Sequence, residues 1–291
     1  MKQKLWLDLA PGLDGAMGLL LANALTEGEV VGISTSFGAV SGETALENAL
    51  RLKEKLGLQA PVYAGAASPV LKTEYPCAPE GEGLFRALPP SSLSKEPSYM
   101  WDALFEAATK EKLTFVALGP LTDLAISFFR YEGLPSLLEE VVLVSGSGDV
   151  GDLTAFGEAN VVRDPYAMEA VLRSGAKLRM VGLDIGRKAA PSPALQEKVD
   201  WLSQSLLGLP APAGKDRYFQ VAAALLSLAE PGLLSSTSYY VTTETAQCSM
   251  HGRTIVDCRA HSTDEKNVSV AMTVDETRFA ALFAQYFPPS L

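Results

Sequence analysis

The stretch LDLAPGLDGAMG, Leu7–Gly18, joins an apolar segment to a helical one and carries two aspartates. Asp8 ends the apolar run Leu-Trp-Leu, where a charge is costly unless it is paired or bound to a ligand. Asp14 stands at a helix start, where a carboxylate can cap free backbone N–H groups. Such oxygens can also hold a cation, bind sugar hydroxyls or take a proton from water. Both aspartates are therefore candidates for chemistry, although capping alone is the simpler explanation for Asp14.

Other polar residues follow later apolar segments. Thr122 lies in ALGPLTDLA, which is also typical of a tight turn that opens a helix. Glu158 and Asn160 lie in the sequence GEAN, where they could also be plain solvated loop residues. Because parallel sheets bind ligands beyond the carboxyl ends of their strands, these positions are predicted to meet at one edge of a sheet.

Short apolar segments alternate with longer amphipathic ones, which predicts βαβ units and a mainly parallel sheet. The expected strands are Lys4–Ala10, Val30–Ser36, Val62–Ala64, Leu113–Leu118, Val141–Ser145 and Leu178–Leu183. The expected helices between them are Asp14–Leu25, Glu43–Leu56, Ser98–Lys110, Leu121–Phe129 and Asp164–Ser174. The predicted fold class is α/β, an open, Rossmann-like sheet flanked by helices.

The pattern changes beyond Pro191. Two helical stretches, Pro193–Leu207 and Asp216–Leu228, precede three short strands, and a helix follows at Glu276–Tyr286. We expect the three strands, in YYVTTET, GRTIVDCR and NVSVAMTV, to form a small, mostly antiparallel appendage. No linker divides the chain convincingly, so residues 1–291 are predicted to form a single domain. The long segment Tyr75–Ser98 is predicted to be a loop that could fold over the site.

The composition narrows the range of partners. With 34 acidic and 24 basic residues, the chain has a formal net charge of -10, which disfavours nucleic acids and anionic membranes as partners. The sequence has no apolar run of the ~20 residues that a membrane helix needs, and its first residues do not have the pattern of a signal peptide. A cytoplasmic protein is expected.

The motifs, taken in order, resemble the inosine-uridine preferring nucleoside hydrolase family over essentially the whole chain. Asp8, Pro11, Gly12 and Asp14 resemble the family's opening Asp-x-Asp-Pro-Gly-x-Asp-Asp turn. Further matches are GISTSFGAVSGETALENALRL, PVYAGAASPV, FVALGPLTDLA, EEVVLVSG, GEANVVRDPYAMEAVLRSG, LDIGRK and GRTIVDCR. The resemblance implies the family's fold, hydrolysis of the N-glycosidic bond of ribonucleosides, and frequent self-association into homo-oligomers.

The resemblance also implies a calcium ion that grips the ribose diol and the attacking water. Several positions that would supply its ligands, or would face the pocket, carry other residues in this chain. They are Ala10, Gly15, Ala39, Gln220 and Val221, while Pro79 and Glu80 stand at the family's His-Gly loop. Asp216 is the nearest late carboxylate, but its register differs by more than one helical turn. We therefore expect no tightly bound cofactor; calcium is the metal that the resemblance would allow.

The residues that remain belong to the sugar side of the site. By resemblance, Asp14, Glu158 and Asn160 would hold the ribose hydroxyls, and Asp8 or Asp14 would act as the catalytic base. If a metal binds, the backbone carbonyl of Thr122 would be a ligand, with Asp8 as a further candidate. Burial without a cation would raise the pKa of Asp8, and we expect a backbone amide or a nearby cation as its partner.

Three functions remain open. The chain could be a divergent hydrolase of nucleosides or related ribosyl compounds, with a weak metal site or none. It could instead be a poorly active or inactive relative that binds a ribosyl or polyol ligand in the cleft that corresponds to the family's active site. We favour this second hypothesis. The third function is purely structural, with YEGLPSLLEE or VAAALLSLA in an oligomer interface.

Overall fold

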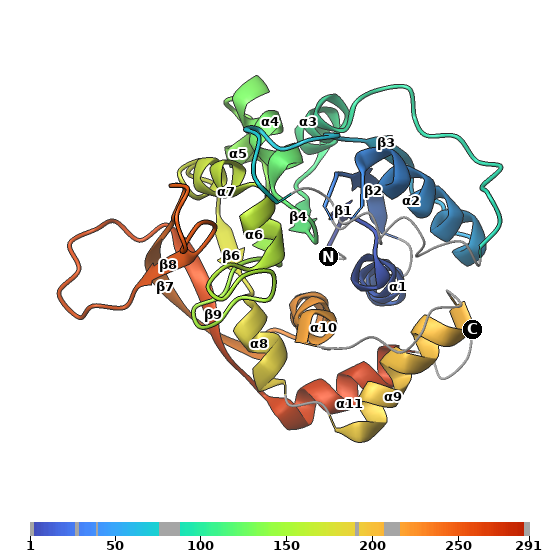
Figure 1. Cartoon of the computed structure of the whole chain (residues 1–291). Coiled ribbons are helices and arrows are strands. Elements are labelled where there is room, and N and C mark those ends of the chain that lie inside the picture. The colour runs from blue at the N-terminus through green and yellow to red at the C-terminus, as the bar shows by residue number, and fades with distance from the viewer. Residues whose placement is uncertain are drawn as a thin grey trace.

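A computed structural model describes residues 3–26, 29–38, 40–75, 88–189, 192–206 and 216–287. Within these residues, nine strands form one sheet in the order β3-β2-β1-β4-β5-β6-β9-β7-β8 (Figure 1). The first six, all parallel to their neighbours, are β1 (Leu5–Leu9), β2 (Val30–Thr35), β3 (Val62–Ala64), β4 (Thr114–Ala117), β5 (Glu140–Leu143) and β6 (Leu178–Met180). The last three are β7 (Leu234–Thr243), β8 (Thr254–Asp257) and β9 (Val268–Val274).

Helices cover both faces of the sheet, and the alternation within β1 explains why. Leu5, Leu7 and Leu9 belong to one apolar core, while Trp6 belongs to the other. The first core packs under α1 (Leu13–Thr26), α2 (Gly42–Leu56), α8 (Leu183–Lys188), α9 (Pro193–Trp201), α10 (Asp216–Ala229) and α11 (Glu276–Tyr286). The second packs under α3 (Met100–Lys110), α4 (Thr122–Arg130), α5 (Leu134–Leu137) and α7 (Pro165–Leu172).

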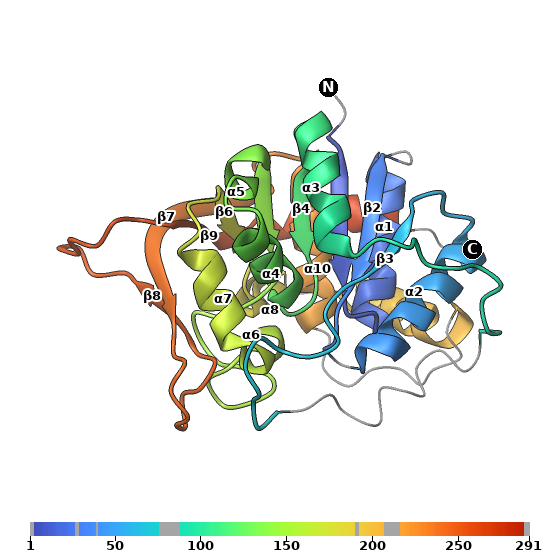
Figure 2. The same ribbon diagram turned by 90° about the horizontal axis from the view of Figure 1, so that it is seen from above.

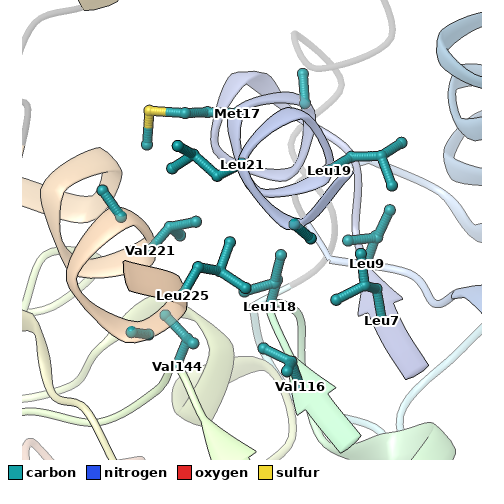
Figure 3. Close-up of a cluster of buried hydrophobic side chains, with 14 of the residues drawn as sticks. Leu7, Leu9, Met17, Leu19, Leu21, Val116, Leu118, Val144, Val221 and Leu225 are labelled. Carbon is teal, nitrogen blue, oxygen red and sulfur yellow. The ribbon is translucent and has the colours of Figure 1, made fainter. Parts of the chain in front are cut away.

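The core between α1 and α10 fixes the position of the site. Leu118, which follows β4, lies between Leu7 and Leu9 of β1 on one side and Val221 of α10 on the other (Figure 3). Gly18 allows this close approach, because a Cβ there would come within 2.4 Å of Leu118 Cδ1 and 3.2 Å of Val221 Cγ1. Helix α10 is thereby held beside the start of α1.

The predicted fold class is confirmed, and most elements agree with their expected ranges to within a few residues. The strand expected at Leu178–Leu183 ends earlier, at Met180, because Leu183 already begins the short helix α8. The expected helix Pro193–Leu207 is α9 followed by a π-helical segment, η2 (Leu202–Leu206). The short helix α6 (Ala159–Arg163) was not expected from the sequence.

The C-terminal strands extend the main sheet and do not form a separate appendage. Strand β9 pairs in parallel with β6, while β7 pairs antiparallel with both β9 and β8. Figures 1 and 2 show β7 and β8 at the end of the sheet farthest from β3. The prediction of mostly antiparallel pairing is confirmed by the β7–β8 and β7–β9 ladders, and β9 also pairs in parallel with β6, with Val268 opposite Leu178.

Two further expectations concern the loop Tyr75–Ser98 and helices that could cross a membrane. Of the predicted loop Tyr75–Ser98, residues 76–87 lie outside the described part of the chain. Among the described residues, no helix is both long enough and apolar enough to cross a membrane.

Candidate functional site

A cleft of about 290 Å³ lies beyond the carboxyl ends of β1, β4 and β5. Segments that follow these strands line it, together with helix α6 and the first turn of α10. The lining residues are Ala10, Gly12, Leu13, Asp14, Leu118, Asp152, Leu153, Ala159, Asn160, Arg163, Arg217 and Tyr218. The sequence places Asp14 and Asn160 at strand ends, and the structure brings both to this one cavity.

Asp14 lies in the first turn of α1 and keeps access to solvent. Its Oδ1 accepts a hydrogen bond of 2.9 Å from the backbone N–H of Gly15. Its Oδ2 lies 3.8 Å from Nη1 of Arg217, and its side chain is 17% exposed. Asp14 is thus anchored by one oxygen, and the other remains available to a ligand.

Glu158 caps helix α6 from the position before its first turn. Its carboxylate accepts hydrogen bonds from the backbone N–H groups of Asn160, Val161 and Gly146, at 3.0, 3.4 and 3.0 Å. Arg217 Nη2 donates a further bond of 2.6 Å to Oε1. The side chain is fully buried, so these four donors take the place of water around the charge.

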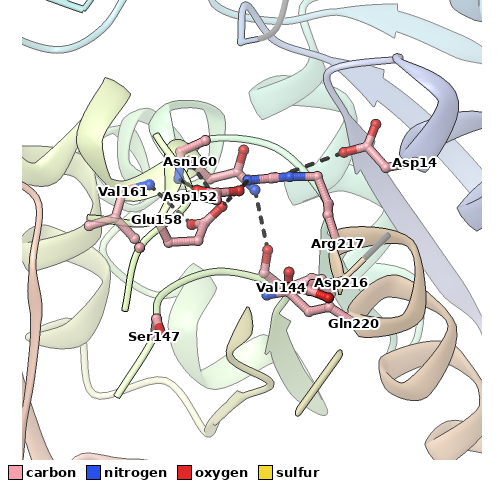
Figure 4. Close-up of polar contacts among 12 residues, drawn as sticks. Asp14, Val144, Ser147, Asp152, Glu158, Asn160, Val161, Asp216, Arg217 and Gln220 are labelled. Carbon is pink, nitrogen blue, oxygen red and sulfur yellow. Dashed lines mark hydrogen bonds and ion pairs between the residues drawn. The ribbon is translucent and has the colours of Figure 1, made fainter. Parts of the chain in front are cut away.

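The side-chain amide of Asn160 bridges the ends of two strands at the wall of the cleft. Its Nδ2 donates to the backbone carbonyl oxygens of Leu118, at 3.3 Å, and Val144, at 3.2 Å. Leu118 follows β4 and Val144 follows β5, so the amide bridges the ends of neighbouring strands (Figure 4). This bridge fixes the orientation of Asn160 in the cavity wall.

The central cation of the cleft is Arg217, which the sequence analysis missed. Its guanidinium lies between Asp14 on one side and Asp152 and Glu158 on the other (Figure 4). Burial lowers the pKa of Arg217, but the charges of Glu158, Asp152 and Asp14 outweigh burial and raise it above its ordinary value. The charge balance of the cleft could have indicated such a residue. Where carboxylates gather and the metal ligands are missing, a positively charged side chain is expected nearby.

Asp216, the late carboxylate considered in the sequence analysis, does not line the cavity. It instead accepts a hydrogen bond of 3.1 Å from Nε of Arg187, and its side chain is 50% exposed. The neighbouring residue Arg217 points into the cleft. The first turn of α10 therefore contributes a cation to the site where a carboxylate was sought.

Asp8 lies behind the cleft, fully buried on the opposite face of β1 from Leu7 and Leu9. The Trp6 indole N–H donates to Ser34 Oγ at 2.9 Å, and that hydroxyl donates to Asp8 Oδ1 at 2.7 Å. The predicted partner of Asp8, a backbone amide or a cation, is wrong: its partners are the hydroxyl of Ser34 and a second carboxyl group, that of Asp123.

Asp8 and Asp123 are buried side by side. Burial raises the pKa of Asp8 to about 6, against the effect of its hydrogen bonds with Ser34 and Asp123. Burial also raises the pKa of Asp123, and the charge of Asp8 adds to the effect. The backbone N–H of Ala66 donates to Asp123 Oδ1 at 2.6 Å. Like charges at this depth cannot both persist, so the pair retains a proton.

Thr122 begins α4, and its side chain binds away from the cleft. Its Oγ1 donates to Oδ2 of Asp164 at 2.6 Å, and Asp164 Oδ2 also accepts from the backbone N–H of Val70 at 2.8 Å. Burial raises the pKa of Asp164, while these hydrogen bonds lower it. Neither Thr122 nor Asp8 is among the residues that line the cavity.

The residues at the expected metal-ligand positions do not fit a calcium site. The methyl group of Ala10 packs against the backbone of Gly38 and Gly119, and Val221 is buried in the core. Gln220 Nε2 donates to the carbonyl oxygen of Val181 at 2.9 Å. Among the described residues, no three His, Cys, Asp or Glu side chains are grouped so that they could hold a metal ion. Ala39, Pro79 and Glu80 lie outside that part of the chain.

Comparison with known families settles the relationship. A family model described as inosine-uridine preferring nucleoside hydrolase matches residues 5–281. The chain belongs to this family. The resemblance found in the sequence is therefore confirmed.

Curated relatives of this nucleoside hydrolase family member match along nearly their whole length. A pyrimidine-specific ribonucleoside hydrolase RihA from Photobacterium profundum is 28% identical, covering 98% of this chain and 98% of its own. A non-specific ribonucleoside hydrolase RihC from Salmonella agona is 29% identical, covering 97% of this chain and 96% of its own.

Solved structures agree in fold. A plant nucleoside hydrolase superposes with a TM-score of 0.85 at 23% identity, covering 99% of this chain and 100% of its own. A purine-preferring ribonucleoside hydrolase from Gardnerella vaginalis gives a TM-score of 0.80 at 24% identity, with 98% of both chains covered.

Proposed function

We propose that this protein binds a ribosyl or polyol ligand in the cleft and has weak or no calcium-dependent nucleoside hydrolase activity. The observation that carries this proposal is the guanidinium of Arg217, which lies 3.8 Å from Asp14 and 2.6 Å from Glu158. The carboxylates of the cleft are paired with the guanidinium of one side chain, while the expected calcium ligands at positions 10 and 15 are alanine and glycine.

The lining of the cleft supports a sugar as the ligand. Asp14 Oδ2 can accept hydrogen bonds from hydroxyl groups, and Arg217 can donate to hydroxyl oxygens beside it. Asn160 lies in the same wall, with its Nδ2 already bound to two carbonyl groups. A volume of about 290 Å³ is at the lower end of the range of ligand pockets, which suits a compact ligand of ribosyl size.

The position of the acidic groups argues against efficient hydrolysis. Asp8 and Asp14 are the two candidate bases, but only Asp14 lines the cavity. Asp8 is buried, and burial raises its pKa to about 6, so its proposed role is to position the end of β1. Asp14 would have to activate water without a Lewis acid that supplies several kcal/mol of stabilisation to the transition state.

The proposal also covers the domain organisation, location and assembly of the protein. We propose one domain over residues 1–291, a cytoplasmic location and homo-oligomer formation. The formal charge of -10 supports a small-molecule partner over nucleic acid or an anionic membrane surface.

Calorimetric titration of chelator-treated protein tests the proposal. Ribose and inosine are added with and without calcium, and release of hypoxanthine from inosine is followed in parallel. We expect ribose to bind equally in both conditions, with little or no base release. Micromolar calcium binding, or inosine hydrolysis that chelation abolishes, would overturn the proposal in favour of an active divergent hydrolase.

Variants identify the binding site. Asp14→Ala and Asn160→Ala should each weaken ribose binding about tenfold, the effect expected from the loss of one hydrogen bond or two. Asp264→Ala is the matched control, because this carboxylate is 49% exposed and does not line the cleft. Unchanged affinity in both cleft variants would show that the sugar binds elsewhere.

A further inference from the structure

Arg217 joins three carboxylates that come from three separate segments of the chain. Asp14 belongs to the first turn of α1, Asp152 to the loop after β5, and Glu158 to the cap of α6. Nη2 of Arg217 donates to Asp152 Oδ2 and to Glu158 Oε1, both at 2.6 Å. Nη1 lies 3.8 Å from Asp14 Oδ2. One guanidinium thus contacts all three carboxylates.

The carboxylates of the cleft require a cation beside them, because Glu158 is fully buried and the three groups lie close together. The side chains of Glu158, Asp14 and Asp152 are 0%, 17% and 29% exposed, and that of Arg217 is 20% exposed. Three converging negative charges repel one another, and a fully buried carboxylate is costly unless a cation lies beside it. A planar guanidinium can donate to several carboxylates at once, which the compact ammonium of lysine does less well.

We propose that Arg217 is the resident cation of the cleft: it occupies the electrostatic position between the sugar-side carboxylates and excludes a divalent metal ion from them. This inference rests on the proposed function, because it explains how the cleft holds a sugar without calcium. It makes Arg217 a determinant of specificity: the cleft offers hydroxyl-binding groups of both signs, and a guanidinium occupies the position between the three carboxylates that a metal ion would need.

A purely structural role for the arginine can be separated from this one, because the chain contains a matched arginine. Arg187 of α8 binds the same loop through the carbonyl oxygens of Val150 and Gly151, at 2.9 and 3.2 Å. It also pairs with the half-exposed Asp216. Arg187 therefore holds the loop without contacting the three carboxylates, so Arg187→Gln is the control for loop attachment.

The experiment measures the melting temperature of the full chain, in chelator and in millimolar calcium. The wild type, Arg217→Lys and Arg187→Gln should show no calcium-dependent shift. Arg217→Gln keeps a polar side chain of moderate length but no charge, and its melting temperature should rise by about 3 °C with calcium. A wild type that shifts as much as Arg217→Gln, or an Arg217→Gln that does not shift, overturns the inference.

A second measurement decides the case if Arg217→Gln does not fold. Calorimetry of the wild type with calcium alone should show no binding at the cleft. Stoichiometric calcium binding that Asp14→Ala removes would overturn the inference without any arginine variant. Ribose titration with and without calcium tests the proposed function, and the calcium-dependent shift of Arg217→Gln tests this inference. A wild type that binds ribose without calcium, together with an Arg217→Gln that shows no shift, would overturn this inference and leave the proposed function standing.

Discussion

Two groups of acidic residues lie on either side of the end of β1, and their partners differ: a guanidinium in the cleft, and a hydroxyl and a backbone amide behind the strand. In the cleft, the carboxyl groups of Asp14, Asp152 and Glu158 lie around the guanidinium of Arg217. Behind the strand, burial raises the pKa of both Asp8 and Asp123, which favours the protonated form of a carboxyl group. A guanidinium stays charged at every pH at which proteins fold, whereas a carboxyl group with a raised pKa loses its proton as the pH rises. The cation of the cleft is therefore present over a range of pH in which the interior pair changes its protonation.

The largest expected effect comes from removing the cation. Arg217→Ala leaves Glu158 fully buried without its ion-pair partner, and we expect a loss of about 3 kcal/mol in the free energy of unfolding. Urea unfolding measures it. Arg187→Ala, whose partner Asp216 is half exposed, should cost about 1 kcal/mol or less. Equal losses would mean that the two arginines act only as loop attachments.

The next largest effect is expected when one carboxyl group of the Asp8–Asp123 pair is replaced by an amide. In Asp123→Asn the amide can keep the bond from Ala66 N–H through its oxygen and donate to Asp8 through its nitrogen. We expect this variant to be more stable than the wild type by about 2 kcal/mol at about pH 8. Unfolding free energies in urea check the difference.

The pH dependence follows from the sign of the shift. The pKa of Asp8 is raised from 3.8 to about 6, so the folded protein holds a proton that the unfolded chain releases. This contribution to stability is complete below about pH 4 and is lost as the pH rises through about 6 and beyond. Asp123→Asn should flatten that decline, while Asp102→Asn, a surface control, should leave it unchanged.

A smaller effect is expected at Thr122. Thr122→Val removes one donor from the buried Asp164, which keeps its bonds from Val70 and Ala167. We expect a loss of about 1 kcal/mol in unfolding free energy. The control Thr109→Val affects a hydroxyl that is exposed and bound to a carbonyl of its own helix, and should change stability very little. A loss in ribose affinity at Thr122→Val would place this residue closer to the ligand than the structure does.

The smallest effect is at Gly15. A Cβ there would meet its nearest neighbour, Pro11 Cβ, at 3.6 Å, which is ordinary contact. Gly15→Ala should therefore stabilise α1 by about 0.5 kcal/mol in thermal unfolding. Gly18→Ala in the same helix should destabilise the protein, because its Cβ would meet Leu118 at 2.4 Å. Stabilisation at Gly15 would show that the fold does not require a glycine where the family resemblance calls for an acidic residue.

Much of the architecture could be predicted because it is local. Apolar runs and helix starts are encoded in neighbouring residues, so the parallel strands and the turn before Asp14 lie close to where the pattern placed them. Arg217 was missed because its three partners lie between 59 and 203 positions away in the sequence. Asp123 lies in the sequence ALGPLTDLA, where nothing local indicates that it meets Asp8. The parallel ladder of β9 is equally long-range.

The position of β9 has a consequence for how the chain folds. Strand β6 ends at Met180, but its second neighbour in the sheet begins only at Val268. Until that late segment leaves the ribosome, β6 has an unpaired edge, and closing the intervening loop is entropically costly and slow. Nascent chains stopped before residue 268 should therefore engage chaperones or aggregate, even though all six earlier parallel strands are already present.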